Sequence, residues 1–180
     1  MTTKTALRAR MRALRRQLAE ACPDAAERVA VHAPALPGVE VFGLYHPVGS
    51  ELDPTAIRLP GARRALPVVV ERQAALVFRL HEPGEALAPD ALGVPAPTTA
   101  APEVWPDVVF TPVLAFDRAG GRLGQGGGHF DRTIEALRGR KRVVVIGVAY
   151  AGQEVAEVPL EPHDQRLDGI LTETGYITVR

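Results

Sequence analysis

Residues 108–150 read VVFTPVLAFDRAGGRLGQGGGHFDRTIEALRGRKRVVVIGVAY, and their pattern decides the fold. Two apolar runs, 108–116 and 141–150, enclose a glycine-rich stretch and a short helical pattern. Continuous β-branched runs are typical of strands that are covered on both faces. In the helical pattern, residues 131–138, Ile134 and Leu137 fall on one face. The stretch therefore predicts a strand, a glycine-rich loop, a helix and a second buried strand.

Similar signals extend along the rest of the chain. An amphipathic helix is predicted over residues 4–21, with Thr3 as its N-cap and Pro23 ending it. Asp53-Pro54 predicts the start of a second helix, because aspartate favours the N-cap and proline the first helical position. The proline-rich segment 82–107 is expected to be an irregular surface connection. Further strands are predicted over residues 39–45, 64–70, 74–80, 170–172 and 176–179. Helices alternating with buried strands indicate an α/β sheet with helices on both faces.

Composition excludes several classes of protein. The chain has 180 residues, of which 46% are apolar, and this length and composition fit a single domain. We expect that domain to span residues 1–180, with residues 1–22 forming a basic helix docked on it. No run reaches the ~18 apolar residues of a membrane span, and no secretory signal is visible. The single cysteine allows no internal disulfide. The net charge of zero argues against a general nucleic-acid-coating protein. We therefore expect a cytoplasmic protein, a monomer, with neither a membrane nor a nucleic acid as partner.

Positive charge is concentrated at the N-terminus. Six of the 21 basic residues fall within the first 16 positions, without an acidic residue among them. Lys4, Arg8, Arg12 and Arg15 form a stripe beside the apolar face of the predicted helix. The stripe is either a solvated face or a surface for a polyanionic ligand. RNA is the less favoured ligand, because the stripe lacks the interleaved aromatic residues that stack on bases.

Glycine is concentrated in the same way, since six of the 17 glycines fall within residues 120–128. Glycines allow close approach of backbone N–H groups to a phosphate, and the start of the following helix adds a positive dipole end. Arg122 can add a bidentate charged contact. The loop matches neither the P-loop nor the dinucleotide fingerprint. A phosphate site is the favoured interpretation, and a flexible turn is the alternative.

Four blocks of sequence resemble one known family. They are Lys4-x-x-x-Arg8, Tyr45-His46-Pro47-x-x-x-Glu51-Leu52-Asp53, the run Phe116 to Arg132 with Arg-Leu-Gly-x-Gly-Gly-Gly, and His163-Asp164-x-x-x-Asp168. In this order they resemble the 5-formyltetrahydrofolate cyclo-ligase family, also called methenyltetrahydrofolate synthetases. The resemblance implies a three-layer α/β/α sandwich with a mostly parallel sheet, like the sugar-phosphate isomerase and CoA-transferase folds.

The resemblance also implies a function. The family closes 5-formyltetrahydrofolate to 5,10-methenyltetrahydrofolate by ATP-dependent phosphorylation of the formyl oxygen, with Mg²⁺ present. Residues implied in ATP binding are Lys4, Arg8, Arg122, Leu123, Gly124, Gln125, Gly126, Gly127, Gly128, His129 and Phe130. Residues implied in folate binding are His46, Glu51, Gln125, Gly126, Gly127, Gly128 and His129. Asp131 and Asp164 are the implied metal ligands.

Ordinary structural roles remain as alternatives for these carboxylates. Asp131 also suits a helix N-terminus, Asp164 a turn, and Glu51 an exposed helix start. His129 and Phe130 stand where the family usually has two aromatic residues, often tyrosines. A non-catalytic relative that binds a nucleotide or folate is therefore the alternative to the enzyme.

Overall fold

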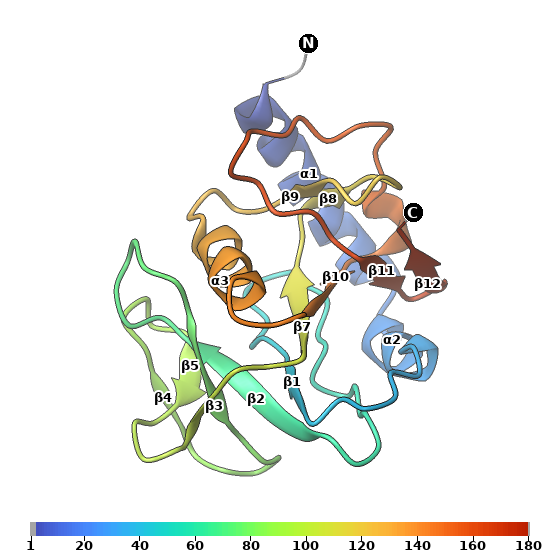
Figure 1. Ribbon diagram of the computed structural model, residues 1–180. Helices are drawn as coiled ribbons and strands as arrows, with labels where there is room; N and C mark the ends of the chain where they lie inside the picture. The colour runs from blue at the N-terminus through green and yellow to red at the C-terminus, as the bar shows by residue number, and fades with distance from the viewer. Residues whose placement is uncertain (1–2, 180) are drawn as a thin grey trace.

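The computed structural model describes residues 3–179, which fold into one long sheet with helices on both faces (Figure 1). The strand order in the sheet is β12-β11-β10-β7-β1-β2-β3-β6. These strands are β1 (Val41–Gly43), β2 (Arg63–Val68), β3 (Val77–Leu80), β6 (Glu103–Val104), β7 (Val108–Pro112), β10 (Val144–Val148), β11 (Gly169–Thr172) and β12 (Gly175–Thr178).

The centre of this sheet is parallel. Strands β2, β1, β7, β10 and β11 run in the same direction, and β10 pairs with β7 over the whole register from Val144↔Val108 to Val148↔Pro112. Antiparallel pairs occur toward the two edges, where β3 and β6 follow β2, and β12 follows β11. The predicted α/β class with a mostly parallel central sheet is confirmed.

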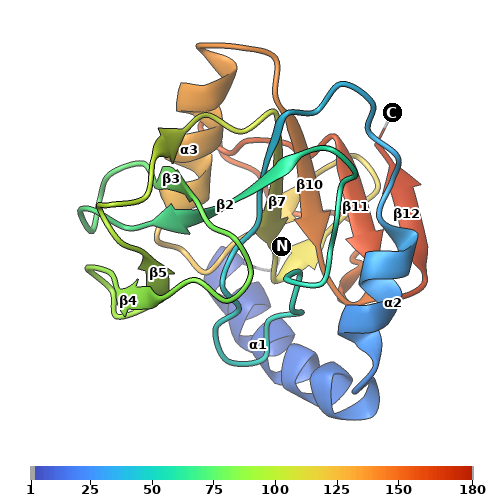
Figure 2. The same ribbon diagram turned by 90° about the horizontal axis from the view of Figure 1, so that it is seen from below.

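Helices cover both faces because the central strands are apolar on both. In β7, Val109 packs with Ile134 and Leu137 of α3 (His129–Arg138), whereas Phe110 belongs to the opposite core. Successive strand residues point to opposite faces, so an unbroken apolar run serves two cores. Figure 2 shows α3 on one side of the sheet and α1 and α2 on the other.

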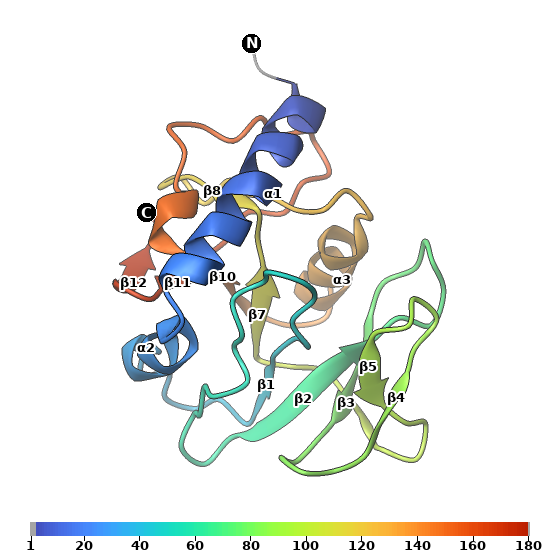
Figure 3. The ribbon, with the colours of Figure 1, turned by 180° about the vertical axis from the view of Figure 1, so that it is seen from behind.

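The first helix, α1 (Lys4–Ala21), has the predicted bounds, and the Thr3 hydroxyl accepts a hydrogen bond from Ala6 N at 3.3 Å. Its N-terminal half buries Leu7 and Met11 in a third cluster, against Leu114 and Leu123. Its other end reaches the core beside α2 (Ala25–His32), as Figure 3 shows. The helix therefore crosses the molecule near the ends of the central strands.

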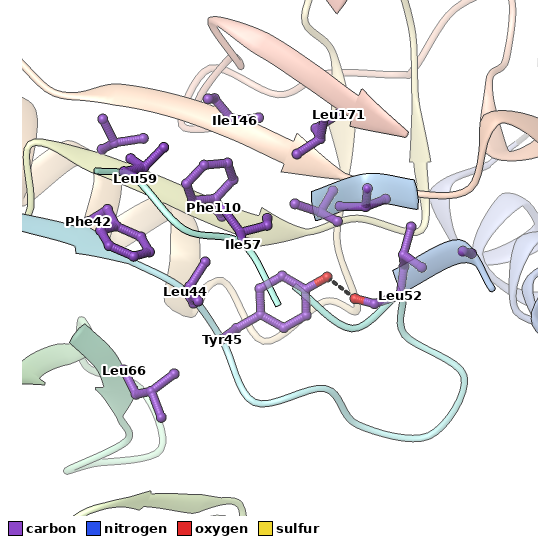
Figure 4. Close-up of a cluster of buried hydrophobic side chains, with 14 of the residues drawn as sticks. Phe42, Leu44, Tyr45, Leu52, Ile57, Leu59, Leu66, Phe110, Ile146 and Leu171 are labelled. Carbon is purple, nitrogen blue, oxygen red and sulfur yellow. Dashed lines mark hydrogen bonds between the residues drawn. The ribbon is translucent and has the colours of Figure 1, made fainter. Parts of the chain in front are cut away.

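The predicted helix at Asp53-Pro54 is wrong. Asp53 Oδ1 instead accepts a hydrogen bond from Thr55 N at 2.8 Å in a turn, and residues 56–62 contain no helix. Ile57 and Leu59 alternate into the core, as in extended chain, and Pro60 and Gly61 follow too soon for a stable helix. Figure 4 shows Leu59 beside Phe42 and Phe110, and Ile57 beside Tyr45, whose hydroxyl donates to Leu52 O.

Several further elements were not predicted from the sequence. Helix α2 precedes β1, and segment 82–107 contains, besides β6, the hairpin of β4 (Leu87–Pro89) and β5 (Pro95–Pro97). A second hairpin joins β8 (Ala115–Phe116) and β9 (Arg122–Leu123), and the 3₁₀ turn η1 (Ala151–Gln153) follows β10. Among residues 3–179, none of the helices combines the length and the hydropathy that crossing a membrane requires.

Candidate active site

A cavity of about 560 Å³ lies at the carboxyl ends of the central strands. Its floor contains Tyr45 and His46 after β1, Pro112–Leu114 at the end of β7, and Val69 after β2. Strand β1 pairs with β2 on one side and with β7 on the other. The strand order therefore reverses at this point, where open α/β sheets bind their ligands.

Every residue that was expected from the sequence to bind ATP, folate or a metal ion lines this cavity. They come from α1, the loop after β1, β9, the glycine-rich loop, the start of α3 and the segment before β11. The lining includes Lys4, Arg8, His46, Glu51, Arg122, Leu123, Gly124, Gln125, Gly126, Gly127, Gly128, His129, Phe130, Asp131 and Asp164. Segments that are up to 160 positions apart in the chain thus line the same cavity.

The glycine-rich loop, residues 124–128, is held by its carbonyl oxygens. Arg8 Nε donates to Gly124 O at 2.9 Å, and Arg132 Nη2 donates to Gly127 O at 2.7 Å. Within residues 3–179, none of the backbone N–H groups of 124–128 donates a hydrogen bond to protein. Gly126 and Gly128 adopt φ values of 107° and 67°, and Gly128 is the N-cap of α3. The loop therefore offers N–H groups beside a helix N-terminus, an arrangement that suits phosphate oxygens.

Arg122 and Asp131 form an ion pair at the cavity wall. Arg122 Nη2 lies 2.5 Å from Asp131 Oδ1, which also accepts a hydrogen bond from Gln165 N at 3.0 Å. The Nε of Arg122 is buried and has no hydrogen-bond partner among residues 3–179. Buried N–H groups normally have a partner, so this guanidinium is unusual in having one unsatisfied buried donor. Asp131 lies in the first turn of α3, where the helix dipole also stabilises a carboxylate.

Lys4 lines the cavity and lies against a group of carboxylates. Its Nζ lies 2.6 Å from Asp164 Oδ2 and 2.9 Å from Glu161 Oε2. Partial burial lowers the pKa of Lys4, but the two carboxylates outweigh this effect and raise it overall. Burial raises the pKa of Asp164, yet hydrogen bonds from Lys4 and the Glu161 amide lower it overall. Both groups are therefore charged at neutral pH.

Two of these carboxylates belong to a group of side chains with the right atoms to bind a metal ion. Ligand atoms of Glu161, His163 and Asp164 lie within 4.8 Å of one another, and all three residues line the cavity together with Asp131. Magnesium prefers hard oxygen ligands and takes few from protein when phosphates supply the rest. The donor set therefore fits Mg²⁺ that is bound together with a polyphosphate. Glu161 was not predicted, although its proximity to Asp164 in sequence was a usable signal.

Glu51 is fixed at the opposite end of the cavity. Its Oε2 accepts a hydrogen bond from Val48 N at 2.9 Å, and its Oε1 lies 3.7 Å from Arg15 Nη1. Burial raises the pKa of Glu51, while the Val48 amide and the Arg15 charge lower it in part. The alternative of an exposed helix acid is wrong, because no helix begins here and the side chain is 9% exposed.

The remaining wall comes from loops that the sequence did not connect with a site. His129 Nδ1 lies 3.0 Å from Ala74 O, and Thr133 Oγ1 accepts a hydrogen bond from Leu76 N at 2.7 Å. Asp90 joins the β4–β5 hairpin to the end of β2 by accepting a hydrogen bond from Val69 N at 3.0 Å. Arg72, Leu92 and Val94 line this side. No motif marks these residues, because tertiary packing alone brings them to the cavity.

Fold and site together define the class of this protein: an α/β protein whose cavity at the carboxyl ends of the strands is lined by a glycine-rich loop and by basic and acidic side chains. The model of the 5-formyltetrahydrofolate cyclo-ligase family matches residues 1–173. The chain is 35% identical over 162 residues to the 5-formyltetrahydrofolate cyclo-ligase of Mycolicibacterium smegmatis, covering 81% of this chain and 82% of that protein. This chain belongs to the 5-formyltetrahydrofolate cyclo-ligase family, a family of ATP-dependent ligases in folate metabolism.

Two further comparisons support this family assignment. Identity to the enzyme of that name from Haemophilus influenzae is 36% over 100 residues, a match that spans 53% of each chain. The solved structure of 5,10-methenyltetrahydrofolate synthetase from Aquifex aeolicus superposes with a TM-score of 0.79 at 28% identity. That superposition covers 98% of this chain and 93% of the Aquifex chain. The family that the four sequence blocks implied is thereby confirmed, together with the α/β class and its mostly parallel central sheet.

Proposed function

We propose that this protein catalyses the ATP-dependent cyclisation of 5-formyltetrahydrofolate to 5,10-methenyltetrahydrofolate, with release of ADP and phosphate. The observation that carries the proposal is the single cavity, which unites the glycine-rich loop, the cationic face of α1 and the buried carboxylate of Glu51. The family name of the relatives supports the choice of substrate.

In this proposal the polyphosphate lies along the glycine-rich loop. Backbone N–H groups of residues 124–128 and the start of α3 receive phosphate oxygens, and the guanidinium of Arg122, which lines the cavity, adds a charged contact. Lys4 and Arg8, one turn apart on α1, bring two cations to the same wall. Leu123, His129 and Phe130 complete the contacts of the nucleotide.

Mg²⁺ would be held by Asp131 and Asp164, with Glu161 as a neighbouring oxygen donor. When bound, the ion supplies positive charge that neutralises the phosphates during transfer. Arg122 and Lys4 orient Asp131 and Asp164 in its absence through their ion pairs.

The folate would occupy the end of the cavity near Glu51 and His46. An ionised Glu51 accepts hydrogen bonds from pterin N–H groups, and the floor after β1 and β7 supplies apolar contact. Gln125 to Gly128 and His129 lie between this end and the phosphate wall, so they contact both ligands. The formyl group is thereby brought beside the γ-phosphate.

The chemistry then needs alignment more than covalent participation by the protein. The formyl oxygen attacks the γ-phosphorus, and ADP leaves. The N10 amine next attacks the formyl carbon and loses its proton, and the C–O bond breaks with departure of phosphate. Because phosphate leaves far more readily than oxide, phosphorylation makes the ring closure possible. The enzyme contributes positioning and stabilisation of charge.

The test uses purified protein with ATP, Mg²⁺ and 5-formyltetrahydrofolate. Methenyl absorbance is expected to grow with time only when ATP is present. Arg122→Ala should lower the rate sharply, whereas Arg140→Ala should not, because Arg140 lies outside the cavity over the Trp105 ring. A flat trace together with normal ATP binding would favour the alternative, a relative that binds nucleotide or folate without turnover.

We also infer that the chain acts as a single-domain monomer in the cytoplasm. Support comes from the site itself, since every proposed contact belongs to one chain. Neither a membrane nor a nucleic acid is required. Light scattering at working concentration, with and without ATP, tests the assembly state.

A further inference from the structure

Arg15 is a buried cation for which the proposed reaction has no assigned role. Its side chain is 6% exposed and lines the cavity, although it belongs to α1, whose other arginines near the cavity are more exposed. Its Nε donates to Ser50 Oγ at 3.2 Å, and its Nη1 lies 3.7 Å from Glu51 Oε1. Both groups belong to the loop that follows β1.

The burial of this pair requires an explanation. A buried charge is costly unless it is paired, and a surface arginine on α1 would serve solvation equally well. The neighbouring Arg16 does remain exposed. Arg15 is therefore placed where its only carboxylate neighbour within ion-pair distance among residues 3–179 is the proposed pterin acceptor.

We propose that Arg15 is a positioning residue that fixes the carboxylate of Glu51 for the N–H groups of the folate. The proposal rests on the proposed function. Arg15 and Ser50 hold the loop from the side of α1, and the Val48 amide holds Glu51 Oε2 from within the loop. Glu51 thus has one oxygen facing a cation and both oxygens restricted in orientation before the substrate arrives.

The placement also connects the two ligands. Lys4 and Arg8 occupy the first turns of α1, on the phosphate wall, and Arg15 lies two turns beyond Arg8 on the folate side. Eleven residues of helix separate Lys4 from Arg15, a rise of ~16 Å. One rigid helix therefore sets the distance between the phosphate cations and the pterin carboxylate.

The ionisable groups around Glu51 determine how its pKa should respond to a substitution of Arg15. Arg15 faces it from α1, Tyr45 and Asp53 lie in its own segment, and Tyr150 faces Arg15 from the end of β10. Burial raises the pKa of Tyr45 well above its ordinary value, so this phenol is neutral in the working range. Arg15 is thus the cation whose removal should raise the pKa of Glu51 further.

The experiment compares Arg15→Gln, Arg15→Lys and the control Arg16→Gln. For Arg15→Gln, KM for the folate should rise by about 10- to 100-fold, because the ion pair that orients Glu51 and the hydrogen bond from the charged Arg15 side chain to Ser50 are both lost. KM for ATP should change less than about twofold, and the acidic limb of kcat/KM for the folate should move to higher pH. Arg15→Lys should restore the limb and part of KM, and Arg16→Gln should resemble the wild type.

Two further measurements separate the possible failures. In a Glu51→Gln background, Arg15→Gln should add no more than about a twofold change in folate KM. Carboxyl NMR of Glu51, which does not depend on turnover, should report a higher pKa in Arg15→Gln than in wild type. An inactive wild type with this NMR shift would overturn the proposed function but keep the pair. An unchanged folate KM and limb in Arg15→Gln would overturn the role of Arg15; if that variant does not fold, an unchanged folate KM and limb in the uncharged Arg15→Met would do so.

Discussion

Gly128→Ala tests most directly whether the glycine-rich loop binds the polyphosphate. Gly128 has φ +67° at the N-cap of α3, and an alanine in the left-handed region costs about 1–2 kcal/mol. The new Cβ would lie 2.7 Å from Arg132 Nη1, so the Arg132 side chain has to move. That movement removes the bond from Arg132 to Gly127 O, which contributes about 0.5–1.5 kcal/mol.

The sum, about 2–3 kcal/mol, favours a relaxed loop over the conformation seen here. ATP would then have to restore that conformation, so its Kd should rise by about 30- to 150-fold. Isothermal titration calorimetry with ATP and Mg²⁺ measures this directly. Thermal unfolding should shift much less, by about 2–4 °C, because part of the strain relaxes and alanine stiffens the unfolded chain.

Gly61→Ala is the matched control. Gly61 has φ +79° in the turn before β2, nothing lies within 4 Å of its Cβ position, and it does not line the cavity. This variant should lose a similar amount of stability yet bind ATP within about twofold of wild type. A folded Gly128→Ala protein that binds ATP as the wild type does would refute the reasoning, and so would equal weakening in both variants.

Three further predictions concern the metal, the sheet and the core. Asp131→Asn removes the ion pair with Arg122 and a proposed magnesium ligand, so the Mg²⁺ concentration for half-maximal rate should rise by about tenfold or more in a titration of activity. For Asp107, burial raises the pKa, but hydrogen bonds from Lys141 and two backbone amides lower it overall. The carboxylate therefore stabilises the fold above its unfolded pKa, and this contribution is lost as pH falls below about 4; urea unfolding of Asp107→Asn should lack it. Ile134→Ala empties a fully buried position between α3 and the sheet and should cost about 2–5 kcal/mol in denaturant unfolding.

Local sequence signals predicted the elements whose patterns are continuous. The heptad-like spacing of Leu7, Met11 and Leu18 predicted α1 with its bounds, and the apolar run 143–148 predicted β10. Local signals gave a wrong prediction where the pattern covered only a few residues. At Asp53-Pro54 the helix-start signal was present, but Pro60 and Gly61 left no length for a helix, and core packing of Ile57 and Leu59 favoured extended chain.

The residues of the site were likewise only partly predicted from the sequence. The glycine cluster, the basic first helix and the family motifs identified residues that all line one cavity. Arg15 and the wall around Arg72 and Asp90 carry no comparable signal. Arg15 looked like one more member of a basic stripe, and only its burial against Glu51 distinguishes it.

The sequence by itself determined the class of fold, the family and the residue types at the site, because periodicity and motifs are properties of short segments. Only the tertiary structure decided which side chains meet. The reversal of strand order at β1 brings the ends of β1 and β7 together, and α1 packs across them through Leu7 and Met11. The pairing of Lys4 with Asp164, 160 positions away, depends on that packing and not on local sequence.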